Sequence, residues 1–189
     1  FTNMQEIFFF QEDNPRPIRL IWWTVPPQNF IKINCDGAFT SHGNKAAAGG
    51  VVRNWEGRFI FAFASALENC SIVEAELWAI KIGMEEAISR RFLNLIVEND
   101  SYSAIELVNR GVQKSHPYYA LVSSIIEMRS KVHQICCNHV FRETNSVADS
   151  LAKYGLSLYP NLSVELFESP PSFIMIPMWR DNSGIIYSR

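Results

Sequence analysis

The stretch IKINCDGA, residues 31–38, alternates apolar and polar side chains. Its odd positions hold Ile, Ile and Cys before a glycine, and its even positions hold Lys, Asn and Asp. This two-residue period is typical of a β-strand with two different faces. We expect the first strand of the fold here, ending in Asp36-Gly37, although Asp-Gly is also a common hairpin turn.

The sequence that follows predicts two more strands. Apolar stretches at residues 46–55 and 58–67 flank Asn54-Trp55-Glu56-Gly57, a turn signal that suits an antiparallel hairpin. From Ser71 the period becomes helical and continues to about Ala87. The fold therefore opens with three neighbouring antiparallel strands and a long amphipathic helix.

The remaining pattern alternates strands and helices. Residues 93–98 form a short strand that leads through Asn99-Asp100-Ser101 into a helix up to Gly111. A helix over 118–132, a strand over 134–142 and a helix over 146–158 complete the order. We therefore predict an α/β fold, with a mixed sheet packed against helices.

The two ends of the chain lack such periods. Residues 1–24 read as an N-terminal tail or linker before Pro26-Pro27, and residues 25–158 as the compact domain. The stretch 159–189 contains four prolines between apolar clusters and is expected to be a C-terminal tail. It packs back on the domain or binds elsewhere; the sequence leaves both open, and its partner is unknown.

Composition describes one ordinary globular domain. The chain has 189 residues, of which 48% are hydrophobic and 19% charged, with a net charge of −2. This charge excludes histone-like binding, and the longest charge-free apolar run is too short to span a membrane. Four cysteines without metal-type spacing favour a reduced, intracellular protein, nuclear or cytoplasmic. We separately expect a monomeric domain. Because the first residue is Phe1, we expect the N-terminus to be incomplete.

Glu76 is the most informative single residue. It lies within the apolar stripe of the helix that begins near Ser71, so it should face the packed side. A buried carboxylate needs a cation, a metal ion or a shifted pKa. An ion pair with a buried arginine explains the position equally well.

Three other acids occupy positions that each have a plain structural explanation. Asp36 ends the first strand, and Asp100 follows the buried strand 93–98, where it or Ser101 caps the next helix. Asp149 lies in the first turn of the last helix, where an acid suits the helix dipole. Positions just past the carboxyl ends of strands are nevertheless where α/β folds bind ligands.

Five motifs in this order resemble the type 1 ribonuclease H family, in particular the ribonuclease-H-like domains related to plant retroelements. The resemblance covers about residues 23–158. The matching segments are IKINCDGA (31–38), GGVVRN (49–54) with Gly57, AELWAI (75–80), VENDS (97–101) and HVFRETNSVADSLA (139–152).

The resemblance implies a five-stranded mixed sheet with helices on both faces. It also implies that four acids form one metal-binding and catalytic cluster: Asp36, Glu76, Asp100 and Asp149. Members of the family use two Mg²⁺ or Mn²⁺ ions to hydrolyse the RNA strand of RNA–DNA hybrids. Clustered carboxylates suit such hard cations.

Substrate contacts are predicted nearby. Gly37 lets a backbone approach a phosphate or ribose, and Asn34 and Asn145 offer hydrogen bonds to 2′-hydroxyls or phosphates. A basic rim is expected from Lys32, Lys45, Arg53, Arg58, Arg142 and Lys153, of which Arg142 is the substrate-binding candidate. Scattered surface charge is the alternative explanation for this set.

Active family members carry a mobile histidine in a loop before the last acid. His139 stands ten residues before Asp149, but it begins a strand-like run, and the loop 143–146 has no histidine. A catalytically weak, domesticated nucleic-acid-binding or interaction module therefore remains the alternative to a hybrid-specific endoribonuclease.

Overall fold

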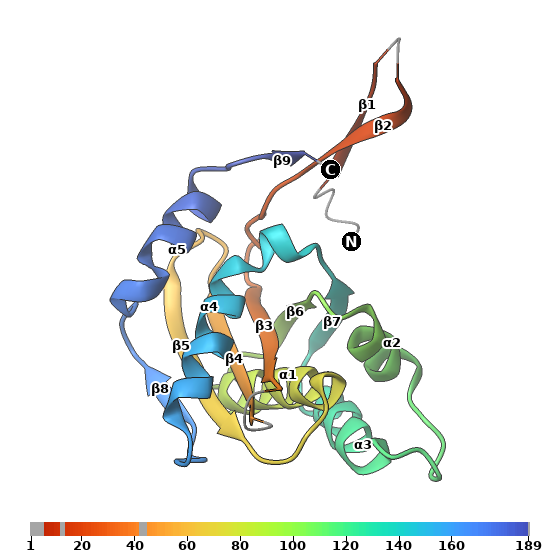
Figure 1. The fold of residues 1–189 in the computed structure, drawn as a ribbon, viewed down its shortest axis with the longest axis vertical. Coiled ribbons are helices and arrows are strands. Elements are labelled where there is room, and N and C mark those ends of the chain that lie inside the picture. Colours follow the sequence, from red (N-terminus) through yellow and green to blue (C-terminus); the bar gives the residue numbers. More distant parts are fainter. Residues whose placement is uncertain (1–5, 12–13, 42–44, 189) are drawn as a thin grey trace.

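The computed structural model describes residues 6–11, 14–41 and 45–188. Its centre is a mixed sheet of six strands in the order β7-β6-β3-β4-β5-β8 (Figure 1). The strands of this sheet are β3 (Ile31–Thr40), β4 (Lys45–Arg53), β5 (Phe59–Leu67), β6 (Asn94–Asn99), β7 (Gln134–His139) and β8 (Glu165–Phe167). The prediction of a mixed α/β sheet is confirmed, with six strands in place of five.

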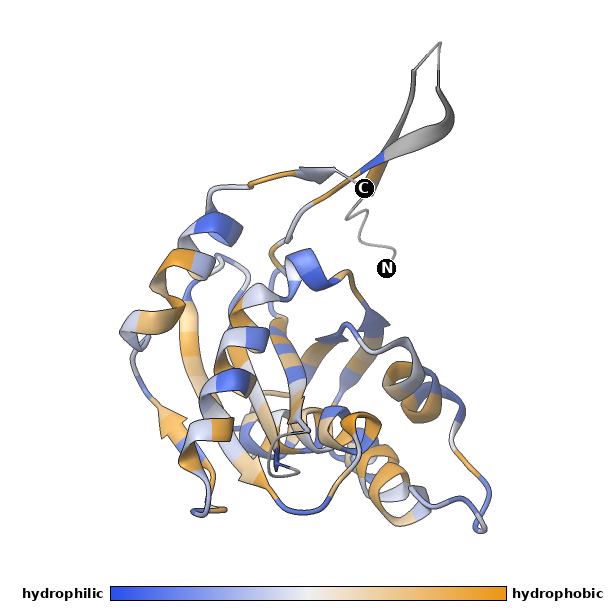
Figure 2. Ribbon diagram, in the orientation of Figure 1, coloured by the Kyte–Doolittle hydropathy of each residue, from blue (hydrophilic) through white to orange (hydrophobic). Residues whose placement is uncertain are grey.

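The register of β3 explains its central place in the sheet. β3 pairs antiparallel with β4, so that Asp36 lies opposite Gly49, and parallel with β6, so that Asn34 lies opposite Glu98. Its alternating side chains appear as bands of opposite hydropathy in Figure 2. The strand continues to Thr40, so Asp36-Gly37 lies within it and forms no hairpin turn.

Helices cover both faces of the sheet, as expected. Three helices and the odd-numbered side chains of β3 build one layer, and two helices cover the other face beside Val51 and Ala62. The first layer contains α1 (Ile72–Ser89), α2 (Tyr102–Arg110) and α3 (Tyr119–Met128), and the second contains α4 (Ser146–Gly155) and α5 (Met175–Asn182). Short 3₁₀ turns are η1 (Arg129–Lys131), η2 (Arg142–Thr144), η3 (Leu156–Leu158) and η4 (Ser172–Ile174).

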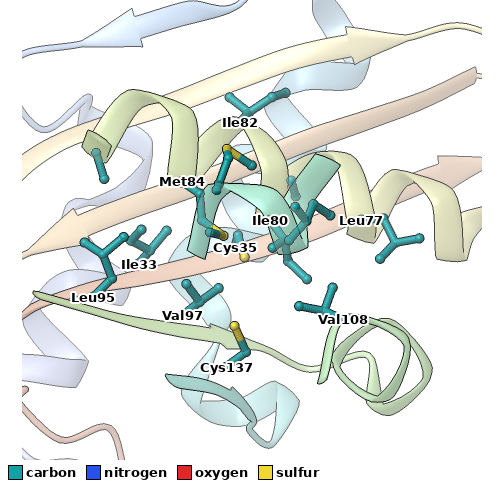
Figure 3. Packing of buried hydrophobic residues seen from close by; sticks show 14 of the residues in the cluster. Ile33, Cys35, Leu77, Ile80, Ile82, Met84, Leu95, Val97, Val108 and Cys137 are labelled. Carbon is teal, nitrogen blue, oxygen red and sulfur yellow. The ribbon is translucent and has the colours of Figure 1, made fainter. Parts of the chain in front are cut away.

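The main core lies between β3, β6 and α1. Ile33, Leu77, Ile80 and Val97 are fully buried there and interdigitate as Figure 3 shows. This packing fixes the rotation of α1 and therefore the direction in which its polar side chains point. The described part of the chain holds no helix long and apolar enough to cross a membrane.

The terminal segments are more ordered than their sequences suggested. β1 (Glu6–Gln11) and β2 (Asn14–Ile21) form a hairpin that projects from the body and pairs with β9 (Tyr187–Ser188) (Figure 1). β8 adds to the main sheet from beyond residue 158, and α5 buries Met178 against it. The segment that the sequence marked as a tail or linker thus contains a hairpin, which local periodicity did not show. The second segment packs back on the domain. The domain boundaries themselves stay a prediction.

Candidate active site

Three carboxylates meet beside the middle of β3, at the carboxyl end of β6. Oxygens of Asp36, Glu76 and Asp100 lie within 4.8 Å of one another. The parallel register of β3 and β6 explains why Asp36 and Asp100 are close. Asn34 lies opposite Glu98, so Asp36, two residues further along β3, is level with Asp100, which follows directly after β6. Ser101 caps α2 by accepting a hydrogen bond from the Ala104 amide, so Asp100 is not needed as a cap.

Glu76 enters this cluster from α1. Its Oε2 accepts hydrogen bonds from the Gly37 amide at 2.7 Å and from Asn99 Nδ2 at 2.8 Å. A Cβ on Gly37 would lie 2.5 Å from the Glu76 nitrogen, so only glycine allows α1 to approach β3 this closely. The backbone of β3 and the end of β6 therefore hold the Glu76 carboxylate in place.

Electrostatics make this cluster a site for protons or cations. Burial and the nearby charges of Glu76 and Asp100 raise the pKa of Asp36 to about 10. Burial also raises the pKa of Glu76 to about 7, although the hydrogen bond from Asn99 opposes the rise. A divalent cation would compensate the same repulsion, and oxygen ligands are those that Mg²⁺ and Mn²⁺ prefer.

Asp149 lies in the same cavity but outside the group of three. It stands in the first turn of α4, and its Oδ2 accepts a hydrogen bond from Lys153 at 2.6 Å. Arg142 lies 3.5 Å from its other oxygen. The fourth acid of the predicted set is thus paired with two cations at one wall of a cavity of about 340 Å³, which the three clustered acids also line.

A family model described as reverse transcriptase-like matches residues 34–155, well over half of the chain. The chain belongs to the reverse transcriptase-like family. A curated ribonuclease H protein of Arabidopsis thaliana is 32% identical over 170 residues, 90% of this chain; the chain spans only 27% of that relative. The matched segments are those of a ribonuclease-H-like domain related to plant retroelements.

Solved structures show the same fold. Ribonuclease H1 of Halobacterium salinarum superposes with a TM-score of 0.63 at 22% identity, covering 68% of this chain and 98% of that one. A ribonuclease H1 isolated from compost was solved in complex with an RNA/DNA hybrid. It superposes with a TM-score of 0.60 at 18% identity, covering 67% of this chain and 96% of that one. The reverse transcriptase-like chain therefore has the ribonuclease H fold.

The predicted substrate residues fall into two groups. Gly37 and Arg142 line the cavity beside the acids. Asn145 is buried at the start of α4 and donates through Nδ2 to the Cys35 carbonyl at 3.0 Å. Asn34 has no exposed surface, so the prediction that it contacts substrate was wrong. Asn145 fits a structural tie between α4 and β3 better than a substrate contact.

Asn34 belongs to a buried polar network on the α5 side of the sheet. It donates to Glu98 at 2.9 Å and accepts from Trp23 Nε1 and from Arg53. Lys32 pairs with Glu98 at 2.6 Å, and Arg53 pairs with Asp181 of α5 at 2.7 Å. Lys32 and Arg53, expected in a basic rim, are fully buried. The sequence placed Lys32 on the polar face of the first strand but could not show that this face is covered.

Side chains of the site that the pattern missed include Asn99, which positions Glu76, and the apolar pair Phe39 and Ile72 at the cavity rim. Asn99 is a fully buried amide at the end of β6, next to Asp100. A polar residue at the carboxyl end of a buried strand is the signal that could have found it.

His139 is a strand residue, as predicted, but it is the last residue of β7, and the strand expected to continue to Arg142 stops there. Its Nε2 lies 3.2 Å from the Asp100 carbonyl oxygen, and its ring contacts those of Tyr102 and Phe141. The histidine is thus near the acids, but it is held at a strand end and not in a free loop.

Proposed function

We propose that this chain is a divalent-metal-dependent endoribonuclease that hydrolyses the RNA strand of RNA–DNA hybrids. The observation that carries the proposal is the meeting of Asp36, Glu76 and Asp100 within 4.8 Å at one end of the sheet. The ribonuclease H fold supports it, as does the name of the curated relative. This chain covers only 27% of that relative, so the transfer of the relative's activity to this chain is part of the proposal.

The residues present fit a divalent cation. Two of the clustered acids are at most 6% exposed and have raised pKa values, so they gain most from a cation that removes their mutual repulsion. Asp36, Glu76, Asp100 and, in the same cavity, Asp149 would hold Mg²⁺ or Mn²⁺. Two such ions, when bound, activate water and stabilise the departing ribose oxygen.

The chain's own groups position the substrate around these acids. Gly37 lines the cavity, but α1 fills the space beside it and its amide is bound to Glu76, so its part is to hold α1 against β3. Arg142, whose side chain is 73% exposed, lines the same cavity and can reach a phosphate. Asn99 keeps Glu76 directed into the cavity. No covalent bond between protein and substrate is required.

The test is cleavage of a labelled RNA–DNA hybrid in Mg²⁺ or Mn²⁺ by the wild-type chain, Asp36→Asn and Glu76→Gln. Losing a metal ligand should reduce the rate at least ~100-fold. Glu74→Gln is the matched control, because it changes a carboxylate of the same helix that lies outside the cluster. Cleavage that survives both site substitutions belongs to a contaminant and overturns the proposal.

A second candidate function is a nucleic-acid-binding module with little or no turnover. The pairing of Asp149 with Lys153 and Arg142 favours it, because these cations compete with a metal ion for the fourth acid. Equilibrium binding separates the two functions. Tight hybrid binding without cleavage in either metal supports the module and contradicts the enzyme.

A further inference from the structure

A strip of aromatic rings leads away from the acidic site. Tyr102 stands two residues after Asp100, at the start of α2, and is 62% exposed. Its ring meets that of His139 edge-on, with centroids 5.8 Å apart. His139 in turn meets Phe141 edge-on at 6.1 Å. We call these three residues, together with Arg19, the aromatic strip.

Both ends of the aromatic strip are anchored. At the acidic end, His139 Nε2 lies 3.2 Å from the carbonyl oxygen of Asp100, one of the three clustered acids. At the other end, the guanidinium of Arg19 lies over the Phe141 ring, 5.2 Å from its centroid. Arg19 belongs to β2, outside residues 34–155 that define the family. The strip therefore joins the acidic site to the projecting hairpin.

The chemistry of the aromatic strip matches a nucleic-acid strand. Exposed aromatic faces beside cations stack bases and riboses with little sequence preference, while arginines contact the phosphates. The Tyr102 hydroxyl donates to Glu106 on the same helix, while the ring, 62% exposed, leaves most of its surface accessible to a ligand. Arg142 follows Phe141 in the chain and adds a second, mostly exposed cation at the wall of the acidic cavity.

We propose that the aromatic strip is a nucleic-acid-binding surface that guides one strand of the hybrid to the acids. The inference rests on the proposed function for the substrate's identity, but it assigns the contacts to residues that the acidic cluster does not include. Tyr102 and His139 contact bases or sugars, and Arg19 contacts a phosphate of the same strand. The projecting hairpin thereby becomes part of the binding surface.

The test is fluorescence anisotropy of a labelled RNA–DNA hybrid with wild type, Tyr102→Ala, Tyr102→Phe and Arg19→Ala, in Ca²⁺ to neutralise the acids. Loss of one stacking ring should weaken binding about tenfold, and Tyr102→Phe should retain it. Arg19→Ala should lower the slope of log affinity against log salt by about 1. Trp179→Ala is the matched control, because it removes an aromatic ring that is 64% exposed on α5.

The outcomes separate this inference from the proposed function. If wild type cleaves the hybrid in Mg²⁺ but Tyr102→Ala and Arg19→Ala bind it as wild type does, the aromatic strip is overturned and the enzyme stands. If wild type binds without cleaving and Tyr102→Ala weakens binding, the strip stands and the enzyme falls. Equal losses in Tyr102→Ala and Trp179→Ala overturn the strip, because the effect is then not local.

Discussion

At the residue scale, Asp36 is the acid whose ionisation the fold opposes most clearly. Its pKa is raised to about 10, mainly by burial, so the folded chain binds a proton that the unfolded chain releases near pH 4. Binding of this proton stabilises the folded state fully at pH values below the pKa of Asp36 in the unfolded chain. The stabilisation is lost as the pH rises towards 10, the pKa in the folded chain. Without divalent ions, the chain should therefore become less stable from pH 5 to pH 9.

Asp36→Asn should remove much of this pH dependence. The asparagine keeps the shape of the side chain without the charge. The free energy of unfolding of the variant should therefore exceed that of wild type by about 1–3 kcal/mol at pH 9 in EDTA. Urea unfolding at pH 5, 7 and 9 measures the difference, and added Mn²⁺ should narrow it by stabilising wild type alone. Equal pH slopes for the two proteins would refute the assignment.

Asn99 acts on the chemistry through Glu76. Its hydrogen bond lowers the pKa of Glu76, and metal ligands must be deprotonated, so Asn99→Ala should weaken Mn²⁺ binding at low pH more than at high pH. We expect a loss of about tenfold at pH 6 that shrinks by pH 9. Calorimetric titration measures it, with Asn94→Ala at the other end of β6 as control. A loss that is independent of pH would show a purely structural role.

At the scale of elements, the approach of α4 to β4 places Asp149 at the site. A Cβ on Gly49 would lie 2.2 Å from the Ala152 nitrogen, and Gly49 pairs with Asp36 across the sheet. The small residue thus sets the distance between the helix and the acid-bearing strand. Without it, α4 must move outward and take Asp149 with it.

Gly49→Ala should therefore affect both stability and activity. The clash involves backbone atoms, which have little freedom to move, so we expect a loss of about 1–3 kcal/mol in unfolding free energy. Hybrid cleavage at a temperature where the variant is folded should fall as well. Thermal unfolding and cleavage assays check the two effects, and an unchanged unfolding midpoint would contradict the close packing.

At the scale of the whole molecule, the C-terminal segment neutralises a charge at the centre of the sheet. Asp181 on α5 forms an ion pair with Arg53, which is fully buried and whose guanidinium carbon also lies 3.7 Å from the centroid of the Trp23 ring. Burial lowers the pKa of Arg53, and the charge of Asp181 opposes that change. The domain and the segment after residue 158 are thus joined electrostatically as well as by apolar packing.

Asp181→Ala should cost about 3–5 kcal/mol, because it leaves a buried guanidinium without its counter-charge. The double variant Arg53→Met, Asp181→Leu should recover much of the loss. Glu168→Gln is the control: it breaks the exposed pair with Arg90 in the same segment and should leave unfolding nearly unchanged. Denaturant unfolding measures the free energy of unfolding of each variant. Equal losses for Asp181→Ala and Glu168→Gln would refute the contribution of the buried pair.

Local periodicity was enough to predict most elements of the domain, whereas the set of four candidate acids came from the family resemblance, because each acid alone has a plain structural explanation. The alternation in residues 31–38 and the helical stripe around Glu76 depend only on neighbours in the chain, and the observed β3 and α1 agree with them. The ends of the elements were predicted less accurately. The strand expected to reach Arg142 ends at His139, and the turn η2 begins at Arg142.

The sequence by itself determined which faces of the strands are polar, in what order the elements follow, and which acids can meet. Only the tertiary structure decided that Asn34, Lys32 and Arg53 are buried, and that β8 and α5 complete the domain. The physical reason is distance along the chain. A side chain's period shows the face it lies on, whereas its environment depends on segments such as α5, 128 residues beyond Arg53, which no local pattern encodes.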